Sequence, residues 1–315
     1  PLGGFQGDLS SLTTPQLGAI AIKAAVERAG VAPAQVQEVI MGCVLPAGLG
    51  QAPARQAALG AGLPLSAGCT TINKVCGSGM KATMLAHDLI LAGSNEVMVA
   101  GGMESMSNAP YLLPKARAGY RLGHGQMFDH MFLDGLEDSY SKENKGRLMG
   151  TFAEDCAGHF NFTRQAQDEF AIASTTRAQA AINNGDFSWE VVPVTVASRK
   201  GDVVVDKDEQ PLKAQIDKIP SLKPAFKKDG TVTPANSSSI SDGAAALVLM
   251  RKSTAEKLGV KPVATIIGHA THAQEPALFT TAPVGAMQKV LAKAGWSTEQ
   301  VDLWEINEAF AVVTM

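Results

Sequence analysis

A single cysteine between a short apolar run and two glycines is the residue best placed to do chemistry. Residues 71–81 spell Thr-Ile-Asn-Lys-Val-Cys-Gly-Ser-Gly-Met-Lys, and apolar residues at helical spacing then continue to Gly93. This pattern predicts a strand, a sharp turn that holds Cys76, and a helix. The free N–H groups and the dipole of a helix start favour the reactive thiolate, and Gly77 and Gly79 would let a substrate carbonyl approach the backbone. We predict a nucleophile; the alternative is a buried core cysteine.

The composition is that of a well-packed soluble protein of more than one core. The 315 residues are 45% hydrophobic and 18% charged, with a net charge of −3. A chain of this length is expected to form two or three packed units. No run of Lys and Arg exceeds two residues, so we expect no nucleic-acid surface. No apolar run approaches the roughly 20 residues that span a bilayer, so we expect no membrane segment.

The four cysteines do not form a metal-ligand pattern. Cys43, Cys69, Cys76 and Cys156 lack CxxC spacing and a histidine at ligand spacing, so we expect no metal site. Unpaired cysteines fit a reducing compartment. Because nothing ahead of the first expected helix resembles a signal peptide, we expect a cytoplasmic protein.

Helices and strands alternate in the first hundred residues, which predicts an α/β fold with a parallel sheet covered on both faces. A long aperiodic excursion follows from about residue 108, and a capping box at Thr151 predicts a helix start. The remaining expected elements alternate less regularly. The predicted helices are 15–29, 52–60, the one after Cys76, 163–184 and 253–258; the predicted strands are 36–44, 96–102, 244–250 and a hairpin at 191–205.

Residues 29–39 and 294–304 align without gaps, and each follows an amphipathic helix. This repeat predicts two related α/β halves, with strands at 263–269 and from residue 301 in the second half. The counterpart of the first of these strands would precede Pro1, and the counterpart of Cys76 would follow Met315. We therefore expect material of both halves to lie outside this sequence.

Four segments resemble motifs of the thiolase family, in the family's order: 73–81, 100–107, 236–245 and the Asn-Glu-Ala-Phe of 305–311. The resemblance covers essentially the whole chain and is most similar to the short-chain acetyl-CoA acetyltransferase branch. It implies a layered α-β-α-β-α fold from two related halves. The N-terminal half would be residues 1–109 with 240–261, the inserted loop domain 110–239, and an incomplete C-terminal half 262–315.

The resemblance implies two-step acyl transfer without a cofactor other than the coenzyme A thioester substrates. Cys76 would take an acetyl group from acetyl-CoA, and the enolate of a second acetyl-CoA would attack this thioester to give acetoacetyl-CoA. The reverse reaction is thiolysis. A thiolate suits both steps, because it is a good nucleophile and leaving group. Asn307 would hold a water in an oxyanion hole, although by itself it could be an ordinary turn residue.

Further roles follow only from matching positions in the family. Ser238 would hydrogen-bond the pantetheine arm of coenzyme A, and Leu148 stands where many acetyl-transferring relatives have a histidine. The excursion at 108–136 matches a loop that assembles a homotetramer. Apolar residues, which by themselves are more often core, would line the acyl and pantetheine tunnel: Met149, Phe226, Phe279, Ala309 and Phe310.

Two family motifs are absent: Gly-His-Pro, which supplies the base, and Cys-x-Gly-Gly-Gly, which supplies the acid/base cysteine. We expect little turnover from a chain without them, because loss of one member of a nucleophile–base unit removes most of the rate. Two other functions stay open at this stage. One is a longer-chain 3-ketoacyl-CoA thiolase, and the other is a non-catalytic CoA-binding or assembly module.

Overall fold

The computed structural model describes residues 1–315, which divide into two compact units. The first unit comprises Pro1–Gly135, Phe187–Gln210 and Ile240–Thr265, and the second comprises Leu136–Asp186, Pro211–Ser239 and Ile266–Met315. None of the helices combines the length and apolar character needed to cross a membrane.

The first unit contains every named β-strand and four of the helices. Its strands are β1 (Gly3–Gly4), β2 (Glu38–Gly42), β3 (Gly68–Ile72), β4 (Val97–Ser105), β5 (Tyr111–Leu112), β6 (Phe128–Asp129), β7 (Val194–Val196), β8 (Val203–Val205) and β9 (Ser241–Met250). Its helices are α1 (Thr14–Ala29), α2 (Pro53–Gly60), α3 (Ser78–Ala92) and α7 (Lys252–Leu258).

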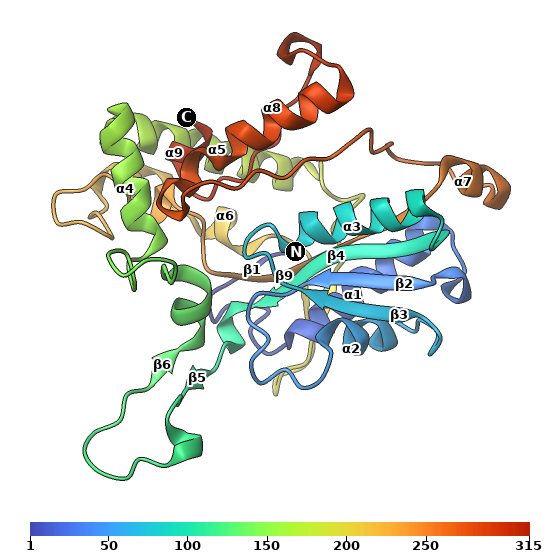
Figure 1. The fold of residues 1–315 in the computed structure, drawn as a ribbon, viewed down its shortest axis with the longest axis horizontal. Helices are drawn as coiled ribbons and strands as arrows, with labels where there is room; N and C mark the ends of the chain where they lie inside the picture. Colours follow the sequence, from blue (N-terminus) through green and yellow to red (C-terminus); the bar gives the residue numbers. More distant parts are fainter. The chain divides into compact units, whose positions relative to one another are not determined.

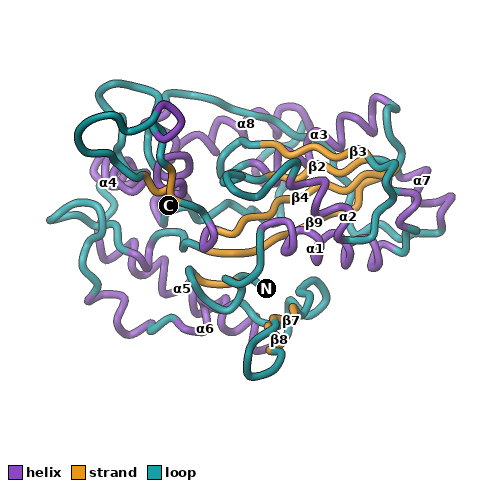
Figure 2. The backbone as a smooth tube through the Cα atoms, turned by 90° about the horizontal axis from the view of Figure 1, so that it is seen from below, coloured by secondary structure: helices purple, strands orange, loops and turns teal.

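A five-stranded sheet of order β1-β9-β4-β2-β3 forms the framework of this unit, as Figure 2 shows for its four longer strands. Strands β2, β3 and β4 are parallel, as the alternation of helices and strands predicts. Strand β9 pairs antiparallel with β4 along its whole length, and β1 pairs antiparallel with β9. The predicted parallel sheet is therefore confirmed for β2, β3 and β4, whereas β9 and β1 make the whole sheet mixed. A strand that returns after a long insertion is not constrained by the helical crossover that makes neighbours parallel.

Helices cover both faces of the sheet because side chains on each strand point alternately to opposite faces. Val39 and Met41 of β2 pack with helices α1 and α2, whereas Ile40 between them packs with α3. Figure 1 shows α3 on the face opposite to α1 and α2. Predicted helices 15–29 and 52–60 agree with α1 and α2 within one residue at each end.

Glycines let α3 lie directly on the backbone of the sheet. A Cβ at Gly42, the last residue of β2, would lie 2.6 Å from the Cβ of Ser78 and 2.8 Å from the nitrogen of Gly79. A Cβ at Gly102 of β4 would lie 3.4 Å from the Cα of Gly79. The start of α3 is therefore fixed against β2 and β4, because neither glycine places a side chain between strand and helix.

Two smaller antiparallel pairs complete the first unit. Strands β7 and β8 form the hairpin predicted at 191–205. Their buried valines pack on Leu9 and Leu17. Strands β5 and β6 pair with each other, and the segment that connects them forms an arm (Figure 1). This arm carries exposed apolar side chains, including Leu122 and Met127.

The second unit is helical. It contains α4 (Met149–Phe160), α5 (Arg164–Asn184), α8 (Ala282–Ala294) and α9 (Ala311–Thr314), while the short helix α6 (Glu209–Lys213) has residues in both units. Helix α5 confirms the predicted helix at 163–184, and Thr163 caps it by accepting a hydrogen bond from the N–H of Ala166. The capping box predicted at Thr151 is wrong. Helix α4 already begins at Met149, and the carboxylate of Glu154 instead accepts from backbone N–H groups of residues 231 and 232.

The two copies of the internal repeat have the same local structure from the helix-ending glycine to the following turn. Gly30 after α1 and Gly295 after α8 both adopt a left-handed conformation, with φ of 66° and 70°. In each copy a glutamine, Gln35 or Gln300, then accepts a hydrogen bond from the backbone N–H three residues earlier. The strand that follows forms only in the first copy, as β2.

The strands predicted at 263–269 and from residue 301 are wrong, because neither segment forms a strand. Apolar residues of these segments are exposed, among them Val263 at 90% and Leu303 at 84%. A strand depends on backbone hydrogen bonds to a neighbouring strand, and an apolar pattern alone does not supply this partner.

We expect the substitution Gly42→Ala to lower the free energy of unfolding by about 1–3 kcal/mol, because its Cβ would overlap the start of α3. Gly68→Ala in β3 is the matched control. Its Cβ would meet its nearest atom, in Glu38, at an ordinary 3.5 Å. Urea unfolding of the two variants measures the effect. An equal loss in both would contradict the close approach.

Candidate functional site

The turn between β3 and α3 presents Cys76 at the surface of the first unit. Strand β3 ends at Ile72 and α3 begins at Ser78, so Cys76 lies in the predicted strand–turn–helix segment. The strand ends four residues before the cysteine, earlier than the apolar pattern predicts. Cys76 is exposed and its thiol is free, so the alternative of a buried core cysteine is wrong.

The residue before the cysteine is held in an unfavourable backbone conformation. Val75 has a φ of 48°, in the left-handed region that β-branched residues rarely adopt. Such a conformation costs on the order of 1–3 kcal/mol and persists only where its surroundings hold it. The N–H of Val75 donates to Oδ1 of Asn73 (2.8 Å), and its carbonyl accepts from the Ser78 hydroxyl (2.6 Å). The strained residue directly precedes Cys76, so these bonds hold the backbone on which the cysteine is carried.

Ser78 closes the turn from the other side. It is buried, and its Oγ accepts a hydrogen bond from the N–H of Lys74 (2.8 Å) while donating to Val75. Sequence reasoning missed Ser78, although its place two residues after the cysteine at a helix start was the available signal. Gly79 also has a role that differs from the prediction. The position of its missing Cβ faces Gly101 and Gly102 of β4, so this glycine permits helix–sheet packing.

The electrostatic environment of Cys76 also differs from the prediction. The pKa of its thiol is raised above the ordinary value of 9.0, because protein groups around the sulfur desolvate the thiolate. A backbone hydrogen bond of Cys76 itself opposes this effect but does not outweigh it. The expected net stabilisation of the thiolate by the helix start is therefore wrong. At neutral pH the resting group is the thiol, and it needs a base to become a nucleophile.

A second set of predicted residues lies in the other unit. The N–H of Ser238 donates to the carbonyl of Ala309 (2.9 Å), and its hydroxyl donates to the carbonyl of Glu308 (2.7 Å). The N–H of Ala309 in turn donates to the carbonyl of Asn307 (2.9 Å). Ser238 and Asn307 are exposed. The structure thus joins the serine loop to the segment that carries Asn307.

The predicted apolar residues form one cluster beside this junction. The ring centroid of Phe310 lies 6.2 Å from that of Phe226 and 6.3 Å from that of Phe279. The same cluster contains Met149, Ala309 and buried residues of α4 and α9. Leu148 is not among its members; it precedes α4 and pairs with Glu137 through the backbone. The structure therefore brings together five of the six predicted apolar residues.

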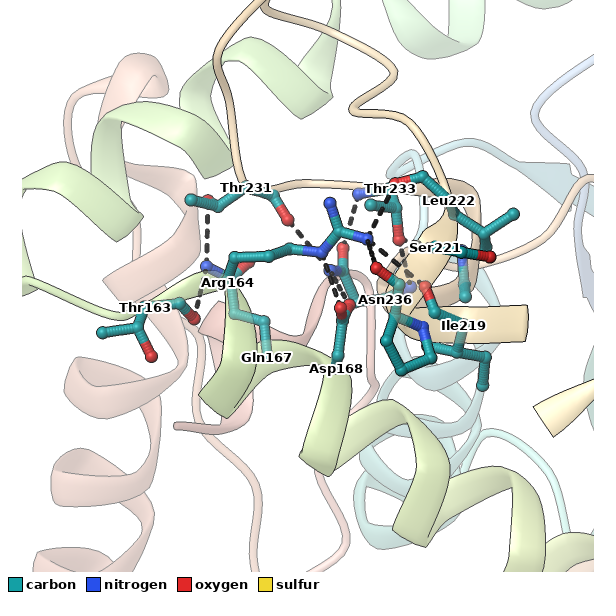
Figure 3. Close-up of polar contacts among 12 residues, drawn as sticks. Thr163, Arg164, Gln167, Asp168, Ile219, Ser221, Leu222, Thr231, Thr233 and Asn236 are labelled. Carbon is teal, nitrogen blue, oxygen red and sulfur yellow. Dashed lines mark hydrogen bonds and ion pairs between the residues drawn. The ribbon is translucent and has the colours of Figure 1, made fainter. Parts of the chain in front are cut away.

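A buried polar network supports the serine loop and was not predicted. Asp168 of α5 receives hydrogen bonds from Arg164 (2.6 Å) and from Nδ2 of Asn236 (3.2 Å), as Figure 3 shows. Asn236 also accepts from the N–H of Thr233 (2.8 Å). Arg164 reaches further, to the carbonyl of Leu222 (2.8 Å). Arg164 and Asp168 are an i,i+4 pair on one helix, but the bonds to Asn236 and Leu222 are long-range, and no sequence motif indicated them.

The two sets of residues belong to different units. Cys76 lies in the first unit, whereas Asn307, Ser238 and the apolar cluster lie in the second. The first set can form and break a thioester, and the second offers an exposed amide, an exposed hydroxyl and an apolar wall.

Comparison with known proteins identifies relatives along the whole chain. The family profile described as thiolase, N-terminal domain, matches residues 1–253, and the profile described as thiolase, C-terminal domain, matches residues 260–315. Acetyl-CoA acetyltransferase 2 of Arabidopsis thaliana is 54% identical over 318 residues, which cover 100% of this chain and 78% of that protein. Acetyl-CoA acetyltransferase of Cupriavidus necator is 50% identical over 312 residues, with coverage of 98% and 78%.

Solved structures agree with these sequence matches. The structure of acetyl-CoA acetyltransferase from Syntrophomonas wolfei superposes with a TM-score of 0.95 at 42% identity, covering 100% of this chain and 78% of that one. The crystal structure of the Bacillus anthracis acetyl-CoA acetyltransferase gives a TM-score of 0.94 at 41% identity, with coverage of 100% and 79%.

Alkylation by iodoacetamide should show the raised pKa of Cys76, because only the thiolate reacts. We expect the rate at Cys76 to rise with pH and to reach half its maximum above pH 9.0. Cys43 is buried, and burial beside Glu104 raises the pKa of its thiol to about 12. It should therefore stay unmodified while Cys76 reacts. Peptide mass spectrometry measures both rates, and a midpoint below pH 8 at Cys76 would contradict the desolvation argument.

Replacing Asp168 by Asn should lower the free energy of unfolding by about 1–3 kcal/mol, because an amide group would face the donors of Arg164 or Asn236. Glu169→Gln on the same helix is the control. Glu169 is exposed and accepts only from the exposed Gln165, so its replacement should change stability by less than about 0.5 kcal/mol. Urea unfolding measures both, and similar values would show that the network is not stabilising.

Proposed function

The chain belongs to the thiolase family, and we propose that it is an acetyl-CoA acetyltransferase, which condenses two molecules of acetyl-CoA to acetoacetyl-CoA and coenzyme A and also catalyses the reverse thiolysis. The observation that carries this proposal is the free thiol of the exposed residue Cys76, which directly follows a strained residue in the turn before α3. Relatives named acetyl-CoA acetyltransferase at 50–54% identity support the substrate.

In the first step the sulfur of Cys76 attacks the thioester carbonyl of acetyl-CoA. A new sulfur–carbon bond forms, the bond to the coenzyme A sulfur breaks, and the departing thiolate takes up a proton. Because the pKa of Cys76 is raised, its own proton must pass to a base as the new bond forms. This chain contains neither Gly-His-Pro nor Cys-x-Gly-Gly-Gly. We therefore assign the roles of base and second thiol to none of its residues.

In the second step the α-carbon of another acetyl-CoA, after loss of a proton, attacks the acetyl-Cys76 thioester. Carbon–carbon bond formation releases the Cys76 sulfur and yields acetoacetyl-CoA. Negative charge on the enolate oxygen needs a fixed donor. We assign this role to Asn307, whose exposed side-chain amide could hold a water against that oxygen.

Substrate binding falls to the second unit in this proposal. Ser238 would hydrogen-bond the pantetheine arm, and the cluster of Met149, Phe226, Phe279, Ala309 and Phe310 would line the path of the arm and the acyl group. Leu148 would contribute only apolar contact, because leucine lacks the polar group that histidine offers in many relatives. No observation favours the longer-chain thiolase or the non-catalytic module.

The proposal extends to assembly and setting. We propose a homotetramer in the cytoplasm, with the arm between β5 and β6 at a subunit contact, because this arm exposes large apolar side chains such as Leu122. Residues 1–109 with 240–261, and residues 262–315, would be the two related halves, with 110–239 inserted. No metal or redox cofactor is needed, because thiol, amide and thioester supply all the groups that the reaction uses.

Incubation with acetyl-CoA above pH 9, where the thiol of Cys76 ionises without a base, tests the proposed function. We expect intact-mass spectrometry to show one added acetyl group per chain, and peptide mapping to place it on Cys76, because this cysteine is the exposed one at the strained turn. Cys76→Ala should take no acetyl group, whereas Cys156→Ala should behave as the unaltered chain. Absence of an adduct on the unaltered chain would contradict the proposed function.

A further inference from the structure

A carboxylate near the end of β4 holds the loop that leaves β2. Glu104 accepts hydrogen bonds from the N–H groups of Val44 (2.7 Å) and Leu45 (3.1 Å). The thiol of Cys43 also donates to it (3.5 Å). Burial raises the pKa of Glu104, and these donors oppose the shift by stabilising the carboxylate. Two adjacent backbone N–H groups on one carboxylate fix the conformation of the loop.

The same loop is bonded on its other side to the turn that carries the nucleophile. The N–H of Cys43 donates to the carbonyl of Ile72 (3.0 Å). The carbonyl of Val44 accepts from Nδ2 of Asn73 (3.4 Å). Asn73 uses its other side-chain atom, Oδ1, to accept the N–H of Val75 (2.8 Å). One amide side chain thus connects the loop held by Glu104 to the residue before Cys76.

This connection ends on the one strained residue of the turn. Val75 has a positive φ, so the turn relaxes when the bonds that hold it are lost. Ser78 holds the turn from within. Glu104 is the charged anchor on the sheet side, and its partners Val44 and Leu45 lie about sixty residues away along the chain.

We propose that Glu104 is a positioning residue for Cys76, which acts through Val44 and Asn73 to keep the thiol aimed for acyl transfer. The inference rests on the proposed function, because it names a supporting residue for that same nucleophile. Glu104 does not touch the reacting atoms. If it served stability alone, its loss would loosen the sheet without a specific effect on the turn or on acetylation.

Glu104→Gln is the test variant because it keeps the size of the side chain. Glutamine offers one acceptor oxygen, so in either orientation its NH₂ group faces a backbone N–H or the thiol of Cys43. Glu38→Gln is the matched control. Glu38 is a partly buried carboxylate at the opposite end of β2, and it accepts from Asn95 (2.8 Å).

Hydrogen exchange measures the connection without reference to catalysis. In Glu104→Gln we expect the segment 73–78 to exchange about tenfold faster, because loss of a charged acceptor releases the loop and Asn73. In Glu38→Gln this segment should exchange as in the unaltered chain. Unchanged exchange at 73–78 in Glu104→Gln would overturn the inference.

Two reactions of Cys76 measure how the loss of the Glu104 carboxylate affects the orientation of the thiol. Acetylation by acetyl-CoA depends on orientation and should slow by about tenfold to a hundredfold in Glu104→Gln. Alkylation by iodoacetamide, a small reagent with few orientation requirements, should change by less than about threefold. Equal slowing of acetylation in both variants, or none in Glu104→Gln, would overturn the inference. Failure of the unaltered chain to take an acetyl group would contradict the proposed function instead, and the exchange result would still decide the connection.

Discussion

The close backbone contact between α3 and the sheet is the constraint on which the proposed nucleophile depends. Gly42 and Gly102 place no side chains between strand and helix, so the start of α3 cannot move without moving β2 and β4. A turn of five residues must then join Ile72 to Ser78 across a fixed gap. The left-handed conformation of Val75 lets the chain make this connection, and the hydrogen bonds of Ser78 hold it.

Fixed geometry at Cys76 comes with a desolvated thiol. Packing around the sulfur removes water from it, and this desolvation disfavours the charged form more than the backbone hydrogen bond of Cys76 favours it. The site is therefore organised for orientation rather than for spontaneous ionisation. The proposed nucleophile must then act as one unit with a base.

Sequence reasoning predicted the parts of this molecule that depend on local pattern. Helices α1, α2 and α5 and the place of Cys76 between strand and helix follow from periodicity and glycine positions. The strand predictions at 263–269 and from residue 301 were wrong, because a strand requires a partner strand that apolar spacing does not reveal. The predicted direction of the Cys76 pKa shift was wrong for a related reason, since packing around a sulfur is a property of the folded chain. The Asp168 network and the bonds of Glu104 join residues about sixty positions apart, and no single segment carries that information.

The hydrogen bond from Ser238 to Glu308 determines whether a ligand at Ser238 would have to present a hydrogen-bond donor or an acceptor. The hydroxyl proton is already committed to the carbonyl of Glu308. What Ser238 still offers is the lone pairs of its oxygen, which attract donors and repel carbonyl oxygens. A ligand that leaves this bond in place must therefore present an N–H or O–H to the serine. The two amides of a pantetheine arm carry such N–H groups, and their orientation along the arm would then set its direction of entry.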